Sequence, residues 1–148
     1  MTKETSTIDG MVVFQERVVN LLQQLKMPLF EVSLVFQKHV KQLLSSLQEY
    51  ASSSNQQLPN ELTEPWGISE VSTNNHQQFS LDKLLERSDA QRMDILDTLI
   101  RVTLIEINIE MDRALLMLRQ WEQVIRTQLS NVQSPGQLFS PLDIPEDW

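Results

Sequence analysis

The side chains best suited to chemistry are few in this sequence and lie far apart. There are two histidines, His39 and His76, and no cysteine. A nucleophile would therefore have to be a hydroxyl group with a histidine partner, but no Gly-x-Ser-x-Gly elbow is present. The three glycines are also too few and too scattered for a phosphate-binding loop. We therefore expect no catalytic residues and no enzymatic activity.

Glu106, Glu110 and Arg113 lie close together in the second half of the sequence, and the two glutamates are the carboxylates to weigh as metal ligands. Carboxylate-bridged metal sites in helical bundles use several glutamates with a Glu-x-x-His motif, and neither histidine follows a glutamate by three residues. Glu110 and Arg113 are spaced to form an ion pair on a helix surface. The sequence thus predicts a structural role for these charges, no metal ligands and no cofactor.

The charge distribution argues against nucleic acid as a partner. The formal net charge is −8, and six of these charges lie in segments 51–79 and 132–148, which contain acids and no bases. Phosphate binding needs clustered lysine and arginine, and no such cluster exists. We expect no direct contact with nucleic acid.

No stretch approaches the roughly 18 consecutive apolar residues of a membrane span. The first residues carry acids and no apolar run, which is not typical of a signal peptide. We expect a cytoplasmic protein, with the nucleus as the alternative.

Periodicity indicates an all-α fold. Between residues 8 and 50 a stripe of apolar residues advances in steps of three or four, as on one face of a helix. This stripe comprises Met11, Phe14, Val18, Leu22, Leu25, Leu29, Val32, Phe36, Val40, Leu43, Leu47 and Tyr50. Pro28 must kink or break such a helix. Because the stripe keeps its phase and no Gly, Asn or Asp adjoins Pro28, we favour one kinked helix over two helices joined by a tight turn.

A polar loop is predicted at 51–79, then a short helix at 81–87 and a long helix at about 89–131. The long helix opens with a capping pattern of Ser88 and Gln91. Its stripe comprises Met93, Leu96, Ile100, Leu104, Ile107, Met111, Ala114, Leu118, Trp121, Ile125, Leu129 and Val132. The strict alternation of Ile105–Met111 suggests a strand as the alternative. Two matched amphipathic helices predict an antiparallel hairpin or small helical bundle, with one domain at 1–133 and a tail at 134–148.

The second long helix carries more apolar surface than one partner helix can cover. At 100° per residue a second apolar face lies nearly opposite the first. It comprises Ile95, Leu99, Val102, Ile105, Ile109, Leu116 and Val124. Either the rest of the chain covers this face within a bundle, or it binds another protein chain, including a second copy of this one.

The tail combines prolines, acids and large apolar groups, so we expect it to be extended. Its candidate binding residues are Leu138, Phe139, Leu142, Asp143, Ile144 and Trp148. Two alternatives remain open: the tail docks in a partner's groove with Trp148 as an anchor, or it packs on its own helices.

Together these features predict a non-catalytic interaction module, such as an adaptor, scaffold or complex subunit. The alternative is a small assembly or secretion chaperone that shields a client's apolar segment, and a small enzyme is the third choice.

Overall fold

The computed structural model describes residues 3–68, 86–131 and 137–140, and these are helical without any strand, as the predicted all-α class requires. The helices are α1 (Lys3–Leu25), α2 (Leu29–Ser53), α3 (Asn60–Thr63), α5 (Ala90–Glu106) and α6 (Met111–Leu129). Glu86 and Arg87 are also helical, and the remainder of the predicted 81–87 helix lies outside the described residues.

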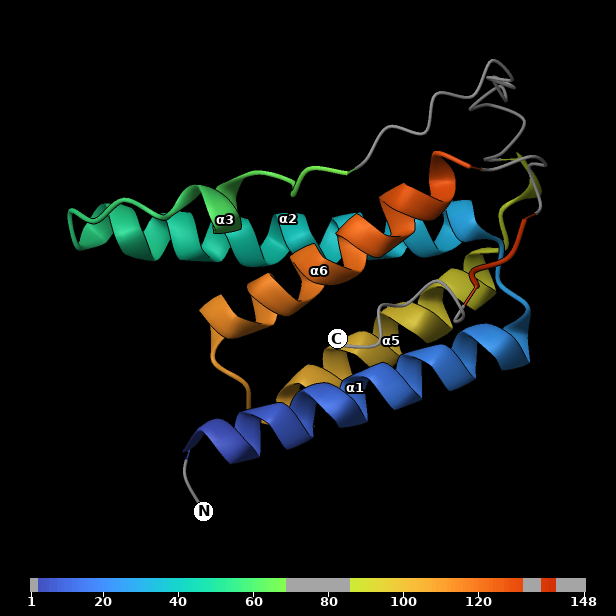
Figure 1. Cartoon of the computed structure of the whole chain (residues 1–148), viewed down its shortest axis with the longest axis horizontal. Coiled ribbons are helices and arrows are strands. Elements are labelled where there is room, and N and C mark those ends of the chain that lie inside the picture. Colours follow the sequence, from blue (N-terminus) through green and yellow to red (C-terminus); the bar gives the residue numbers. More distant parts are fainter. Residues whose placement is uncertain (1–2, 69–85, 132–136, 141–148) are drawn as a thin grey trace.

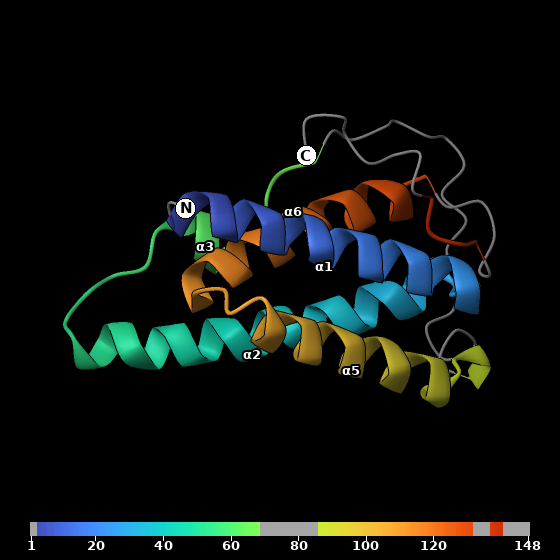
Figure 2. The same cartoon turned by 90° about the horizontal axis from the view of Figure 1, so that it is seen from below.

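The four long helices surround one core (Figure 1). α1 and α2 run in opposite directions, with α5 and α6 between them in this view. Seen from below, α2 and α5 form one side of the bundle and α1 and α6 the other (Figure 2). The most extensive helix pair is α2 with α6, and α5 lies against both α1 and α2. Each of the four long helices therefore turns an apolar stripe toward the shared core.

The first predicted helix is two helices, so the single kinked helix is wrong. α1 ends at Leu25, and Lys26 adopts a left-handed conformation with φ of 50°. The Met27 amide then donates to the Leu22 carbonyl, which is the Schellman arrangement of a helix C-terminus. Pro28 follows in an extended conformation and precedes the first turn of α2. The turn was missed because lysine occupies a position that usually carries glycine or asparagine.

The long helix predicted at 89–131 is also interrupted, so it is wrong as one continuous rod. α5 ends at Glu106, and α6 begins at Met111. Asn108 has a φ of 51° and its amide donates to the Ile105 carbonyl, which closes the end of α5. The alternating stretch Ile105–Met111 thus covers the end of α5, the connection 107–110 and the first residue of α6, and it contains no strand.

The core is centred on Trp121 of α6, which is 1% exposed. Its ring stacks on Phe36 of α2 at a centroid distance of 5.2 Å and meets the edge of Phe14 of α1 at 6.2 Å. Phe139, beyond the helices, stacks on Trp121 at 5.6 Å. One indole thus joins three helices and the C-terminal segment, and this burial contributes much of the packing free energy.

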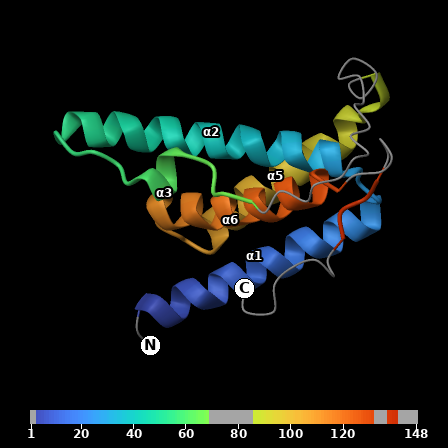
Figure 3. The same ribbon diagram turned by 45° about the horizontal axis from the view of Figure 1, so that its top comes forward.

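The predicted polar loop at 51–79 begins later than expected and contains a short helix. α2 continues to Ser53, and a Schellman turn at Asn55, with φ of 53°, redirects the chain. α3 then lies against α6, beside the second half of α2 (Figure 3). Residues 69–79 lie outside the described part of the chain.

Side chains of α6 hold the segment from α3 to Ile68 in place. Arg119 Nε donates to the Leu62 carbonyl at 3.1 Å, and Arg119 also pairs with Glu122 at 2.9 Å. Gln123 Nε2 donates to the Gly67 carbonyl, and Arg126 donates to that of Trp66. These donors recur along one side of α6, and they satisfy backbone carbonyls of α3 and of the irregular segment that follows it.

Candidate interaction surface

The outer face of α5 exposes a row of aliphatic side chains. Ile95, Val102 and Ile105 are 39%, 40% and 72% exposed. They are seven and three residues apart, which places them on one side of the helix. The opposite side of α5 packs inward through Leu96 and Ile100, both fully buried. α5 therefore carries apolar residues on its core side and on its solvent side.

The other residues of the predicted second face lie elsewhere. Leu99 and Ile109 are half-buried against the core. Leu116 is half-buried and Val124 is 7% exposed, and both belong to α6. The turn at Asn108 changes the direction and rotational phase of the chain, so faces that coincide on a helical wheel separate in space. The structure brings Ile95, Val102 and Ile105 together on the surface and places Leu116 and Val124 inside the bundle.

The described part of the tail is packed on its own chain. Phe139 is 7% exposed against Trp121, whereas Leu138 is 44% exposed. The Gln137 carbonyl accepts a hydrogen bond of 2.7 Å from the Leu29 amide, which would otherwise be an unpaired donor at the start of α2. Gln128 exchanges two hydrogen bonds of 2.9 Å with the backbone of Ser140. Residues 137–140 thus behave as part of the helical domain, while Leu142, Asp143, Ile144 and Trp148 lie outside the described residues.

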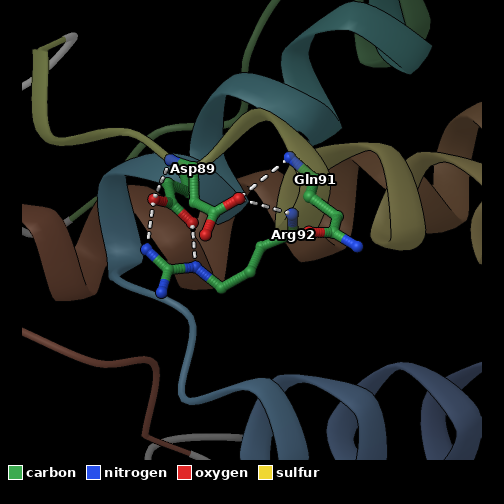
Figure 4. A network of polar contacts seen from close by, with 4 residues as sticks. Asp89, Gln91 and Arg92 are labelled. Atoms are coloured by element: carbon green, nitrogen blue, oxygen red, sulfur yellow. Dashed lines mark hydrogen bonds and ion pairs between the residues drawn. The ribbon is translucent and has the colours of Figure 1, made fainter.

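An ion pair between a buried carboxylate and a half-buried arginine connects the start of α2 to the start of α5 (Figure 4). The Glu31 side chain is 0% exposed, and its two oxygens accept from Arg92 at 3.0 and 2.8 Å and from the Asp89 amide at 3.0 Å. The Asp89 carboxylate in turn caps α5 by accepting from the Gln91 and Arg92 amides. The sequence prediction placed this cap at Ser88, one residue early, and did not identify the buried pair. The one acid within the apolar stretch 29–36, Glu31, could have indicated a buried charge that needs a partner.

A second charged cluster joins α2 to the middle of α5. His39 Nε2 lies 2.8 Å from Asp97 Oδ1, off the direction of a well-formed hydrogen bond, and Lys38 Nζ lies 3.2 Å from the same oxygen. Burial lowers the pKa of His39 by more than the neighbouring Asp97 raises it, so the pKa lies below 6.5. Burial by itself would raise the pKa of Asp97. The effect of Lys38 and His39 is larger and opposite, so the pKa of Asp97 lies below its usual 3.8. The arrangement joins two helices and presents no aligned nucleophile and base.

Glu106, one of the two glutamates weighed as metal ligands, also has a structural role. Glu106 pairs with Arg17 of α1, which also donates to Thr103 at 3.3 Å. Within residues 3–68, 86–131 and 137–140, no three His, Asp or Glu side chains are grouped closely enough to hold a metal ion. None of the helices in this part of the chain is long and apolar enough to cross a membrane.

Comparison of the chain with protein-family models, with curated proteins and with solved structures finds no match. The class is therefore defined by the molecule itself: the described residues form an all-α fold with four long helices, and α5 among them exposes an aliphatic row to solvent.

Proposed function

We propose that this protein is a non-catalytic interaction module, an adaptor, scaffold or complex subunit, that binds protein through the outer face of α5. The observation that carries the proposal is the exposed row of Ile95, Val102 and Ile105. Removing apolar surface from water is favourable by about 25 cal/mol per Å². A row of three such side chains on one helix is a suitable docking surface for an apolar partner surface.

The terminal residues 141–148 are proposed as a second contact. They combine Leu142, Ile144 and Trp148 with three acids. Tryptophan is a frequent anchor at interfaces, and the adjacent acids would select a basic partner. The packing of Phe139 against Trp121 supports this role, because it attaches the residues just before this peptide to the helical domain.

The docking face is tested by chemical cross-linking and affinity purification from native extract. The test variant is Val102→Glu with Ile105→Glu, which places charge in the aliphatic row. The matched control is Gln37→Glu with Gln48→Glu, which adds the same charge at exposed positions of α2. We expect the wild type and the control to retain a specific folded partner that the test variant loses. Identical capture by all three proteins would contradict the proposal.

The nature of the captured molecule separates the adaptor from the chaperone. A folded partner that binds the purified protein supports an adaptor or complex subunit. An aggregation-prone client that stays soluble only in the presence of this protein would instead support the chaperone. Truncation after Ser140 tests the second contact, because it removes the terminal peptide and keeps Phe139.

A further inference from the structure

Two exposed charges lie beside the aliphatic row of α5. Asp94 and Arg101 are both exposed, and neither forms an ion pair with any other residue that the structure describes. They are seven residues apart, so they lie on the same flank of the helix, separated by roughly 10 Å along its axis. Thr98, also exposed, lies midway between Ile95 and Arg101.

The exposed face of α5 is complementary to the same face of a second, antiparallel copy. When a second α5 is placed antiparallel, with a two-fold axis near Thr98, Ile95 of one copy meets Val102 of the other. In the same register each Asp94 faces the Arg101 of the opposite copy, which gives two equivalent ion pairs. A parallel two-fold arrangement would instead place the charged flanks of the two copies on opposite sides of the contact, so no pair between Asp94 and Arg101 would form.

We infer that the partner of this face is a second copy of the chain, bound through an antiparallel α5–α5 contact. The inference rests on the proposed docking role of α5 and names the occupant. The contact is isologous, so it closes as a dimer and does not extend into a filament.

The dimer is expected to be weak and concentration-dependent. α5 has 17 residues, or about 25 Å of helix, which limits the buried area to less than a standard interface. Each copy also carries a formal net charge of −8, so the two repel one another at long range. This repulsion is screened at physiological ionic strength, where the Debye length is about 8 Å.

Reversal of single charges tests the pairing. Sedimentation equilibrium at high micromolar concentration should show dimer for the full-length wild type. Asp94→Arg alone and Arg101→Asp alone should each weaken dimerisation about tenfold or more, because each creates two like-charge contacts. The double variant Asp94→Arg with Arg101→Asp should recover the wild-type affinity to within about threefold. An equimolar mixture of the two single variants should form a heterodimer.

Matched controls separate pairing from a general effect of net charge. Glu49→Arg and Lys41→Asp change the charge by the same amounts at exposed positions of α2, so they should leave dimerisation unchanged and should not promote association when mixed. Circular dichroism checks that every variant is folded.

Cross-linking tests the register. Because the chain has no cysteine, Thr98→Cys introduces a single thiol at the proposed two-fold axis, and Gln48→Cys provides an exposed control on α2. A short bis-maleimide should link the Thr98→Cys protein into dimers and leave the Gln48→Cys protein mostly monomeric.

A monomeric wild type at all concentrations, or a mixture of single variants that stays monomeric, would overturn the dimer. The docking role of α5 would survive this result if Val102→Glu with Ile105→Glu still abolished capture of a different folded protein. If the wild type dimerises but that variant dimerises equally well, the dimer forms through another surface and the α5–α5 contact is wrong.

Discussion

Trp121 of α6 and Phe139 of the C-terminal segment are stacked, with ring centroids 5.6 Å apart and ring planes at 30°. This contact makes residues 137–140 part of the folded domain, although the sequence pattern grouped them with the acidic tail. It also determines where the chain can be shortened without loss of the core.

We therefore expect two truncations to differ sharply. Removal of residues 137–148 deletes Phe139 and the carbonyl that pairs with the Leu29 amide. The free energy of unfolding should fall by about 3–5 kcal/mol, as for loss of a buried aromatic ring. If the last eight residues serve the proposed second contact and not the core, truncation after Ser140 should change it by less than about 0.5 kcal/mol. Urea denaturation followed by tryptophan fluorescence measures both, and Phe139→Ala should reproduce most of the larger loss.

Lys26→Gly should stabilise the protein by about 1 kcal/mol, because glycine adopts the left-handed conformation without the steric cost that a side chain incurs. In a continuous helix the same change would be destabilising by a similar amount, so its sign distinguishes two helices from one kinked helix. Lys41→Gly, in the interior of α2, is the control and should be destabilising. Thermal and urea unfolding measure both changes.

Arg92→Ala should be destabilising by about 3 kcal/mol. The substitution leaves the Glu31 carboxylate, at 0% exposure, without its charged partner, and an uncompensated buried charge is costly. The double variant Glu31→Met with Arg92→Met should recover most of this loss, since it replaces the pair with apolar side chains of similar size. A double-mutant cycle in urea provides the measurement. Equal instability of the single and double variants would show that packing, and not the buried charge, determines the effect.

Stability should decrease as the pH falls below 6.5. The pKa of His39 is lowered in the folded protein, chiefly by burial, so the unfolded chain binds a proton more readily than the folded one. His39 therefore destabilises the fold progressively from its unfolded pKa, near 6.5, down to its lower folded value. Asp97, whose folded pKa lies below 3.8, adds a further loss in more acidic solution as its pairing is removed. His39→Gln should flatten the pH dependence of the unfolding free energy between pH 7 and 5. An unchanged slope in that variant would assign the dependence to other groups.

The sequence by itself determined the helical class and most of the core. A period near 3.6 residues requires one helix face to be buried, and Phe14, Val18, Phe36, Ile100 and Trp121 are buried as this pattern predicts. Exceptions occur where no element covers the stripe: Tyr50 is 69% exposed near the end of α2, and Met111 is 45% exposed at the start of α6.

Only the tertiary structure decided where the helices end and which apolar residues stay on the surface. The apolar periodicity does not reveal where one helix ends and the next begins, because consecutive helices that face one core can keep a common phase across a turn. The ends of α1 and α5 depend on Lys26 and Asn108, which adopt the left-handed conformation. Lysine and asparagine can adopt this conformation but do not require it, so the sequence does not reveal it. Beyond the turn at Asn108, Val124 faces the core, whereas Ile105, before the turn, faces solvent. The packing of neighbouring helices decides this difference, because the order of residues along a single helix would place both on the same face.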